Sequence, residues 1–259
     1  MLLAIDVGNT NLVLALGEVD GGIREVRRIR TDDVCDEDAC AGLMRGVFGT
    51  ALDDVTNSIV ASVVPKVTPH VRGAVESLTG VAPMMVGDKA VDLGIAVNID
   101  RPEQAGADRL VNAVAAKIHH DLPAIVLDFG TATTLDLVAA DGAYEGGIIA
   151  PGVALSIESL ERAAAQLPKL ELRSFDNDLP ILGKNTIAAM ESGVFWGYVS
   201  MIDGLRSRLR AAHVGPGDDM TTIMTGGLAG LFASHLAGPV VVDADLTVKG
   251  LFEIFARNR

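Results

Sequence analysis

The chain carries the same short pattern twice, once in each half, and this repeat constrains the fold more than any other feature. One apolar run leads into Asp6 in "LLAIDVGNTNLVLAL", and another leads into Asp128 in "AIVLDFGTATTLDLV". In both copies a corner with glycine and threonine follows, then a second apolar run and a turn aspartate. Asp6 precedes its turn aspartate, Asp20, by 14 residues, and Asp128 precedes Asp141 by 13. We interpret the repeat as an internal duplication of one β-hairpin unit.

Predicted strands alternate with predicted helices along the rest of the chain. Besides the two repeated hairpins, the expected strands are 58–64, 221–225 and 239–243, and the expected helices are 36–49, 71–78, one that includes 110–118, and 187–209. The helices are indicated by apolar residues at helical spacing, and the strands by short apolar runs. Because the two kinds of element alternate, we expect an α/β fold.

Composition excludes several classes of protein. The 259 residues carry a formal net charge of −13, whereas a nucleic-acid groove needs a basic face, so no nucleic-acid partner is expected. No apolar run approaches the about 18 residues of a membrane span, and no secretory signal is recognised. Two cysteines make neither a disulfide framework nor a zinc site. We expect a cytoplasmic protein without a membrane partner.

The two corners combine carboxylates with glycines, which suits a phosphate site. Burying a carboxylate such as Asp6 is costly unless something pairs with it. Glycine lets backbone N–H groups approach a phosphate closely, and Asn9, Thr10 and Thr131 add donors. Aspartates repel phosphate, so we expect them to hold a cation that binds it, as carboxylates hold Mg²⁺. The alternative is two Asx-type turns at strand ends; the matching positions of the copies favour the phosphate site.

Two more motifs offer polar or glycine-rich chemistry. "TGGLAG" follows a predicted strand, and its glycines would admit a flat ring or a phosphate. In "GADRLVNA", Asp108 and Arg109 open a helix and could supply a base and an anion clamp. Aspartate is also common as a helix cap, and spacing alone leaves both interpretations open. P-loop and Rossmann motifs are absent.

Together these motifs resemble the type III pantothenate kinase family, which belongs to the acetate and sugar kinase, heat-shock chaperone and actin superfamily. The motifs that carry the resemblance are "DVGNTN" at 6–11, "GADR" at 106–109, "DFGTATT" at 128–134, "EGGIIAPG" at 145–152, "GKNT" at 183–186 and "TGGLA" at 225–229. Each alone is a weak signal, but six in this order span nearly the whole chain.

The resemblance implies an architecture and a reaction. It implies two duplicated actin-like, ribonuclease H-like lobes, 1–115 and 116–259, with a nucleotide cleft between them, and a homodimer. The implied reaction is ATP-dependent phosphorylation of pantothenate to 4'-phosphopantothenate, the first step of coenzyme A biosynthesis. The implied cations are Mg²⁺ with ATP and a monovalent cation, K⁺ or NH₄⁺. The apolar stripe of 187–209, with Met190, Trp196 or Tyr198, and Met201, is by default core, and the resemblance points partly to a subunit interface.

The resemblance also implies roles for individual residues. The residues that would bind ATP are Asp6, Val7, Gly8, Asn9, Thr10, Asn11, Leu12, Val13 and Thr131. The residues that would hold pantothenate are Gly106, Ala107, Asp108, Arg109 and Thr186. Asp108 would be the general base, Asp6 would position Mg²⁺, and Asp128 would bind the monovalent cation.

One position departs from the family pattern, and two other functions stay open. The family often carries a tyrosine shortly before "GADR", and Ile99 stands at the nearest equivalent position here. One alternative is a non-catalytic regulatory homologue, whose mark would be a lost Asp6, Asp108 or Asp128; all three are present. The other is a different small-molecule kinase of the superfamily, against which "GADR" and "GKNT" together weigh.

Overall fold

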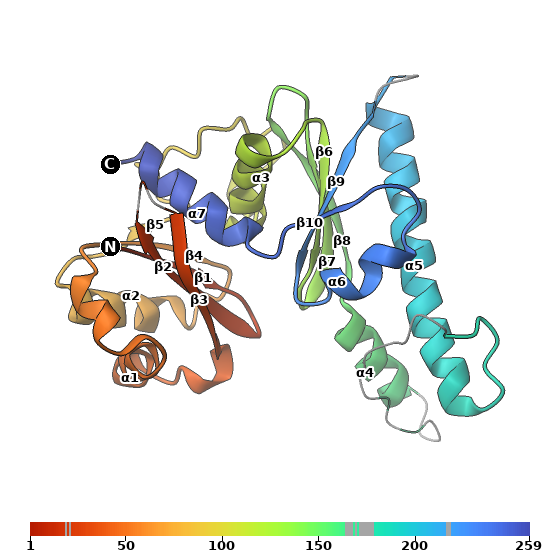
Figure 1. Cartoon of the computed structure of the whole chain (residues 1–259), viewed down its shortest axis with the longest axis horizontal. Helices are drawn as coiled ribbons and strands as arrows, with labels where there is room; N and C mark the ends of the chain where they lie inside the picture. Colours follow the sequence, from red (N-terminus) through yellow and green to blue (C-terminus); the bar gives the residue numbers. More distant parts are fainter. Residues whose placement is uncertain (19, 21, 164–167, 169, 171–178, 216–218) are drawn as a thin grey trace. The chain divides into compact units, whose positions relative to one another are not determined.

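The chain folds into two compact units (Figure 1). The computed structural model describes residues 1–18, 20, 22–163, 168, 170, 179–215 and 219–259. The first unit comprises Met1–His120, Gly142–Tyr144 and Asp245–Arg259. The second comprises Asp121–Asp141 and Glu145–Ala244. Each unit contains one five-stranded sheet and its own hydrophobic core.

The sheet of the first unit has the strand order β3-β2-β1-β4-β5. Its strands are β1 (Leu2–Val7), β2 (Asn11–Glu18), β3 (Gly22–Arg30), β4 (Asn57–Ser62) and β5 (Met84–Met85). β1, β2 and β3 form an antiparallel meander, and β4 and β5 continue the sheet in parallel with β1. The sheet is therefore mixed, with the predicted hairpin at its centre.

Two layers of helices cover the first sheet, one on each face. Helices α1 (Glu37–Phe48) and α2 (Thr68–Thr79) pack on the face that carries Leu3 and Ile5. Helices α3 (Ala107–His119) and α7 (Leu246–Arg257) pack on the face that carries Leu2 and Ala4. Successive side chains of a strand point to opposite faces, and both faces of this sheet are covered, so Leu2 to Ile5 of β1 are all apolar. Short 3₁₀ turns lie at Thr31–Asp33, Gly49–Asp54 and Pro102–Gln104.

The second unit repeats the sheet of the first, in the order β10-β9-β6-β7-β8. Its strands are β6 (Ala124–Phe129), β7 (Ala132–Val138), β8 (Tyr144–Pro151), β9 (Thr221–Gly226) and β10 (Val241–Val242). Its helices are α4 (Val153–Ala163), α5 (Thr186–His213) and α6 (Ala229–Phe232), with a 3₁₀ turn at Ala233–His235. β6 pairs antiparallel with β7 and parallel with β9, as β1 does with β2 and β4. The predicted duplication is confirmed.

The two hairpins differ by one residue, and the difference lies in the corner. In the first hairpin Val7 pairs with Leu12, which leaves four residues between the paired positions. In the second, Phe129 pairs with Thr133, which leaves three. The extra residue accounts for the spacing of 14 against 13 in the sequence.

The C-terminal helix departs from the predicted division at 115/116. Helix α7 belongs to the first unit, where it packs on α3 and on the sheet. The segment Gly142–Tyr144 also belongs to the first unit, through a parallel bridge between Tyr144 and Val97. A division by sequence position could not predict that these two later segments belong to the first unit, because long-range packing places them there.

The apolar stripe of α5 packs on the core of the second unit, as the default interpretation predicts. Met190 and Tyr198 are buried in that core, and Trp196 and Met201 pack against it half-buried. A partial contribution of this helix to a subunit interface stays a prediction. Among the described residues, no helix is long and apolar enough to cross a bilayer.

Candidate active site

The first corner joins β1 to β2, and Thr31, the residue that follows β3, holds it closed. The N–H of Gly8 donates to the carbonyl of Asn11 at 3.0 Å. Thr31 donates its N–H to the carbonyl of Thr10 at 3.0 Å and its hydroxyl to the carbonyl of Gly8 at 2.7 Å. Thr31 is buried. Its bonds engage carbonyl oxygens that would otherwise repel a phosphate, and they restrain the corner.

The pairing register places Asp6 on the face of the sheet that α3 and α7 cover. Asp6 lies level with Val13 on β2 and Ala61 on β4. Ala61 belongs to the core under α3 and α7, and Val13 packs against it. Val7 and Leu12 point the other way and are fully buried under α1 and α2. Of these predicted ATP-binding residues, Val7 and Leu12 could therefore contribute only backbone groups.

The start of α3 lies beside the first corner, at the carboxyl ends of β1 and β4. Val63 directly follows β4, and its N–H donates to the carbonyl of Val7 at 3.1 Å. A Cβ placed on Gly106 would lie 3.5 Å from Val63 Cγ1 and 2.5 Å from Asp108 Oδ1. "GADR" and "DVGNTN", 100 residues apart in the sequence, thus meet at the carboxyl ends of β1 and β4. Any side chain at Gly106 would displace the Asp108 carboxylate.

Asp108 and Arg109 each have a defined local contact. Asp108 Oδ1 accepts the N–H of Arg109 at 2.8 Å, within the first turn of α3. The Arg109 guanidinium lies over the ring of Tyr144, 5.8 Å from its centroid, and Tyr144 is 1% exposed. Asp108 therefore stabilises the first turn of α3 locally, although Gly106 and not Asp108 is the N-cap residue.

Tyr144 and Thr31 belong to the site's surroundings, and sequence reasoning missed both. Tyr144 is buried against the segment before "GADR": its carbonyl accepts the N–H of Asn98 at 2.8 Å, and its N–H donates to Ala96 at 2.9 Å. Ile99 follows directly and is half-buried. An aromatic ring does accompany Arg109, but it comes from a distant strand end. No local pattern marks either residue, since both contacts depend on long-range pairing.

In the second unit, glycines from two motifs pack directly on the second corner. Asp128 lies level with Thr134 on β7 and Thr225 on β9. A Cβ on Gly226 would lie 2.6 Å from both Asp128 Oδ1 and the carbonyl oxygen of Phe129, and its φ is +87°. A Cβ on Gly152 would lie 2.2 Å from the carbonyl oxygen of Thr131. Only glycine fits at these positions, so "TGGLA" and "EGGIIAPG" shape this corner.

The predicted substrate residue Thr186 is the first residue of α5 and is exposed. Asn185 caps the helix by accepting the N–H of Ala188 at 2.9 Å. A Cβ on Gly183 would lie 2.2 Å from the N of Ala189, so the glycine lets the motif fold against its helix.

Comparison with known proteins identifies the family. The family model for type III pantothenate kinase matches residues 2–208, which contain both corners, "GADR" and "GKNT". The chain belongs to this family. Type III pantothenate kinase from Rhodospirillum centenum is 46% identical over 263 residues, covering 100% of this chain and 99% of the relative.

Solved structures of other proteins share the fold at low identity. A conserved Baf family protein from Campylobacter jejuni has a TM-score of 0.57 at 17% identity and covers 99% of this chain and 97% of its own. The inorganic polyphosphate/ATP-glucomannokinase from Arthrobacter has a TM-score of 0.51 at 15% identity, covering 99% and 98%. These likenesses show the two-unit α/β fold of actin-like kinases, as predicted, and the match to the type III family shows a kinase.

The described residues of this type III kinase hold no cluster of three or more His, Cys, Asp or Glu that could bind a metal. A cation at Asp6 or Asp128 would therefore rely on backbone oxygens, water and phosphate oxygens. The second corner brings two such oxygens together, since an Asp128 carboxylate oxygen and the Phe129 carbonyl oxygen both pack closely against Gly226. Oxygen ligands of this kind suit hard cations.

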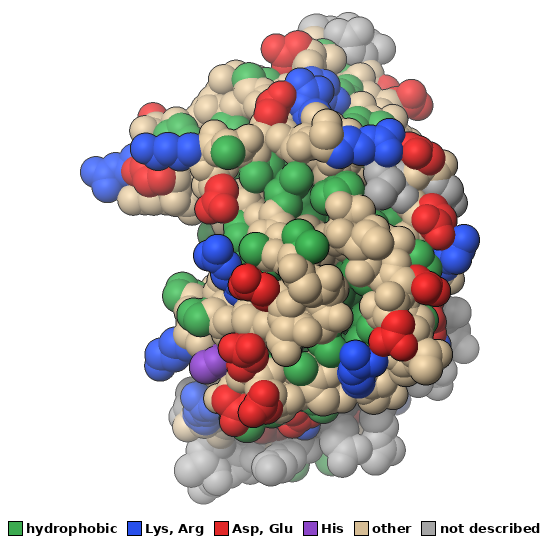
Figure 2. Space-filling view, turned by 90° about the vertical axis from the view of Figure 1, so that its left-hand side faces the viewer, with side chains coloured by type: hydrophobic (Ala, Val, Ile, Leu, Met, Phe, Trp, Pro, Cys, Tyr) green, Lys and Arg blue, Asp and Glu red, His purple; other side chains and the backbone are tan. Residues whose placement is uncertain are grey.

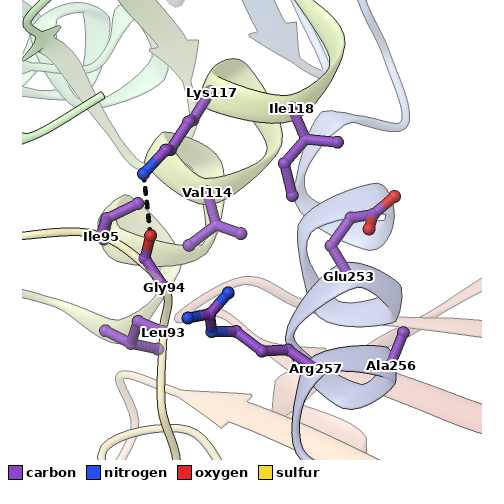
Figure 3. Close-up of a pocket in the computed structure, with 9 residues that line it drawn as sticks. All are labelled: Leu93, Gly94, Ile95, Val114, Lys117, Ile118, Glu253, Ala256 and Arg257. Atoms are coloured by element: carbon purple, nitrogen blue, oxygen red, sulfur yellow. Dashed lines mark hydrogen bonds between the residues drawn. The ribbon is translucent and has the colours of Figure 1, made fainter. Parts of the chain in front are cut away.

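A separate cavity of about 310 Å³ lies towards the other end of α3 (Figure 3). Its walls come from the loop around Gly94, from α3 and from α7. The charged groups at its rim already have partners: Lys117 Nζ donates to the Gly94 carbonyl at 2.9 Å, and Arg257 Nε pairs with Asp92 at 2.7 Å. We assign it no part in the kinase reaction.

Proposed function

We propose that this enzyme transfers the γ-phosphoryl group of ATP to the primary hydroxyl of pantothenate and releases ADP. The product, 4'-phosphopantothenate, begins coenzyme A biosynthesis. The observation that supports the proposal is that "GADR" lies next to the first corner, at the carboxyl ends of β1 and β4. The full-length match to named type III pantothenate kinases supplies the substrate. It does not favour a non-catalytic homologue or another small-molecule kinase.

The first corner is proposed to hold the ATP phosphates. Asn9 and Thr10 are exposed at its tip, and Asp6 and Asn11 flank it. Val7, Gly8 and Leu12 would contribute backbone groups, and Val13 apolar surface. Thr131, at the tip of the second corner, stays a predicted ATP contact on the resemblance alone. When bound, Mg²⁺ at Asp6 would neutralise charge on the phosphates.

Asp108 is proposed as the general base. Phosphoryl transfer needs mainly positioning, together with removal of the proton from the attacking hydroxyl. The Arg109 N–H orients the Asp108 carboxylate, which would accept that proton as the new P–O bond forms and the bond to ADP breaks. Gly106 and Ala107 would border the bound pantothenate, with Arg109 as an anion clamp and Thr186 as a further contact.

Asp128 is proposed to hold the monovalent cation, K⁺ or NH₄⁺. The support is a pair of oxygens that lie close together against Gly226, one from the Asp128 carboxylate and one from the Phe129 carbonyl. Both are ligand types that hard cations prefer.

The predicted cytoplasmic location stays a prediction.

The homodimer stays a proposal, and the exposed surface of the second unit adds candidate contacts beside the α5 stripe. Large apolar side chains are exposed there on β8, on α4, and just before and at the start of α5. They are Ile149, Leu155, Leu160, Ile181, Leu182 and Ile187. Exposed apolar side chains of this size are typical of contact surfaces.

An assay of the purified protein tests the proposed reaction. ATP, Mg²⁺ and K⁺ are supplied with pantothenate or with other small alcohols, including hexoses, and ADP formation is followed. We expect pantothenate to be preferred by kcat/KM and activity to fall when Na⁺ replaces K⁺. Preference for a hexose would contradict the substrate, and equal turnover in Na⁺ would contradict the cation site.

A further inference from the structure

Strand β3 carries four exposed arginines on the outer side of the first hairpin, and three of them pair with carboxylates. Arg24 pairs with Glu18 at 3.0 Å, Arg27 with Glu25, and Arg30 with Asp32 at 3.5 Å. Arg28 has no ion-pair or hydrogen-bond partner within the part of the chain that the structure describes. Its five N–H donors are available to a ligand.

The strand register places Arg28 on the same face of the sheet as Asp6. Asp6 pairs with Val13, and Val13 pairs with Arg28, so the three side chains share one row. The row before it, Ala4, Ala15 and Val26, packs into the core under α3 and α7. Paired residues of neighbouring strands point to the same face, so the exposed Arg28 side chain extends from the face that carries Asp6.

The distance between the strands suits a bound anion. β1 and β3 are separated by β2 alone, which puts their backbones about 10 Å apart. Val13 fills the row between them and offers apolar surface along which an arginine stem can lie. Arg28 also lies three residues before Thr31, which holds the first corner closed. An anion bound at this corner would therefore lie within reach of Arg28.

The charge of the whole protein makes such a cation useful. The chain has a net charge of −13, and ATP and pantothenate are both anions, so the average field repels its substrates. The face drawn in Figure 2 shows many acidic side chains with basic ones scattered among them. An unpaired guanidinium on the row of Asp6 would offset this repulsion locally and could form bidentate bonds to a phosphate or carboxylate.

We infer that Arg28 is an anion-binding residue of the first corner. It would contact either the polyphosphate of the nucleotide or the carboxylate of pantothenate. The inference rests on the proposed function and adds a residue that none of the motifs contains.

Arg28→Gln and Arg27→Gln test the inference as a matched pair. Both remove one exposed arginine charge from β3, but Arg27 lies on the opposite face, level with Ile5 and Leu14, and pairs with Glu25. Calorimetric Kd values for a non-hydrolysable ATP analogue and for pantothenate are measured for both variants and wild type, with KM values beside them. We expect Arg28→Gln to weaken binding of one anion by about tenfold or more. Arg27→Gln should change both by less than about threefold.

The affected ligand identifies the contact. A loss confined to the ATP analogue assigns the polyphosphate. If Arg28→Gln instead binds pantothenate more weakly, a pantothenate analogue with an alcohol in place of the carboxylate is measured as well. An unchanged affinity for this analogue assigns the contact to the carboxylate. Equal affinities in the two variants for both ligands would overturn the inference. Binding is measured without turnover, so this result can be told apart from a failure of the proposed function. The proposed function would fail if the wild-type enzyme bound pantothenate but did not phosphorylate it.

Discussion

At the scale of single residues, Asp108 combines a structural and a chemical role. Its Oδ1 accepts the Arg109 N–H, which asparagine could also do through its amide oxygen. Asp108→Asn should therefore fold and bind ATP but lose turnover by about 10²- to 10⁴-fold, the usual contribution of a general base. Steady-state kinetics with pantothenate, together with nucleotide binding, measure this loss. Turnover within a few-fold of wild type would leave Asp108 as a helix-stabilising residue only.

Thr31 gives a second prediction at this scale, because it links β3 to the first corner. Thr31→Val keeps the shape but removes the hydroxyl that donates to the Gly8 carbonyl. We expect the KM for ATP to rise several-fold, because a loosened corner must be ordered when ATP binds. The free energy of unfolding should fall by about 1 to 3 kcal/mol. Thr31→Ser retains the hydroxyl and should stay near wild type. The same KM in Thr31→Val and wild type would show that the bond does not position the corner.

At the scale of elements, α5 is fixed to its sheet by a buried arginine. Arg206 donates to Thr222 Oγ1, to Asp203 Oδ1 and to the Ala237 carbonyl, each at 3.1 Å, and it is 4% exposed. Burial lowers the pKa of Arg206, and the neighbouring Asp203 raises it in opposition. The cation thus joins α5 to β9 and to the segment before β10.

Arg206→Met should therefore destabilise the protein, since it removes three hydrogen bonds, one of them to the hydroxyl of the buried Thr222. The expected cost is about 3 to 5 kcal/mol, which corresponds to a fall in Tm of roughly 10 °C. Arg208→Met is the matched control, because Arg208 is on the same helix and, among the described residues, bonds only to the carbonyl of Gly204 in its own helix. Differential scanning calorimetry compares the two. Equal Tm values would show that the buried contacts of Arg206 contribute nothing net.

At the scale of the whole molecule, the exposed apolar residues at the start of α5 predict association. Ile181 and Leu182 are 73% and 75% exposed, which is unfavourable for large aliphatic side chains in water. We expect wild type to be a dimer by light scattering and the double variant Ile181→Ser, Leu182→Ser to dissociate at lower concentration. Val81→Ser, on the first unit, is the control. A wild-type monomer at working concentration would contradict the dimer.

The sequence alone determined the class of fold and the identity of the motifs. Strand and helix periods and the spacing of Asp6 and Asp128 are local properties, and local patterns suffice to predict a duplicated hairpin. Six motifs in order sufficed for the family. The capping role of Asn185 was also predictable, because a cap involves only neighbouring residues.

Only the tertiary structure decided which residues meet and which face they share. The contact of Thr31 with Gly8, the stacking of Arg109 on Tyr144 and the return of α7 to the first unit all join distant segments. The packing of Met190 and Tyr198 into the core of the second unit also follows only from the tertiary structure. A shift of one residue in register reverses every side chain of a strand, so the face of Arg28 follows from pairing and not from its own neighbours in the sequence.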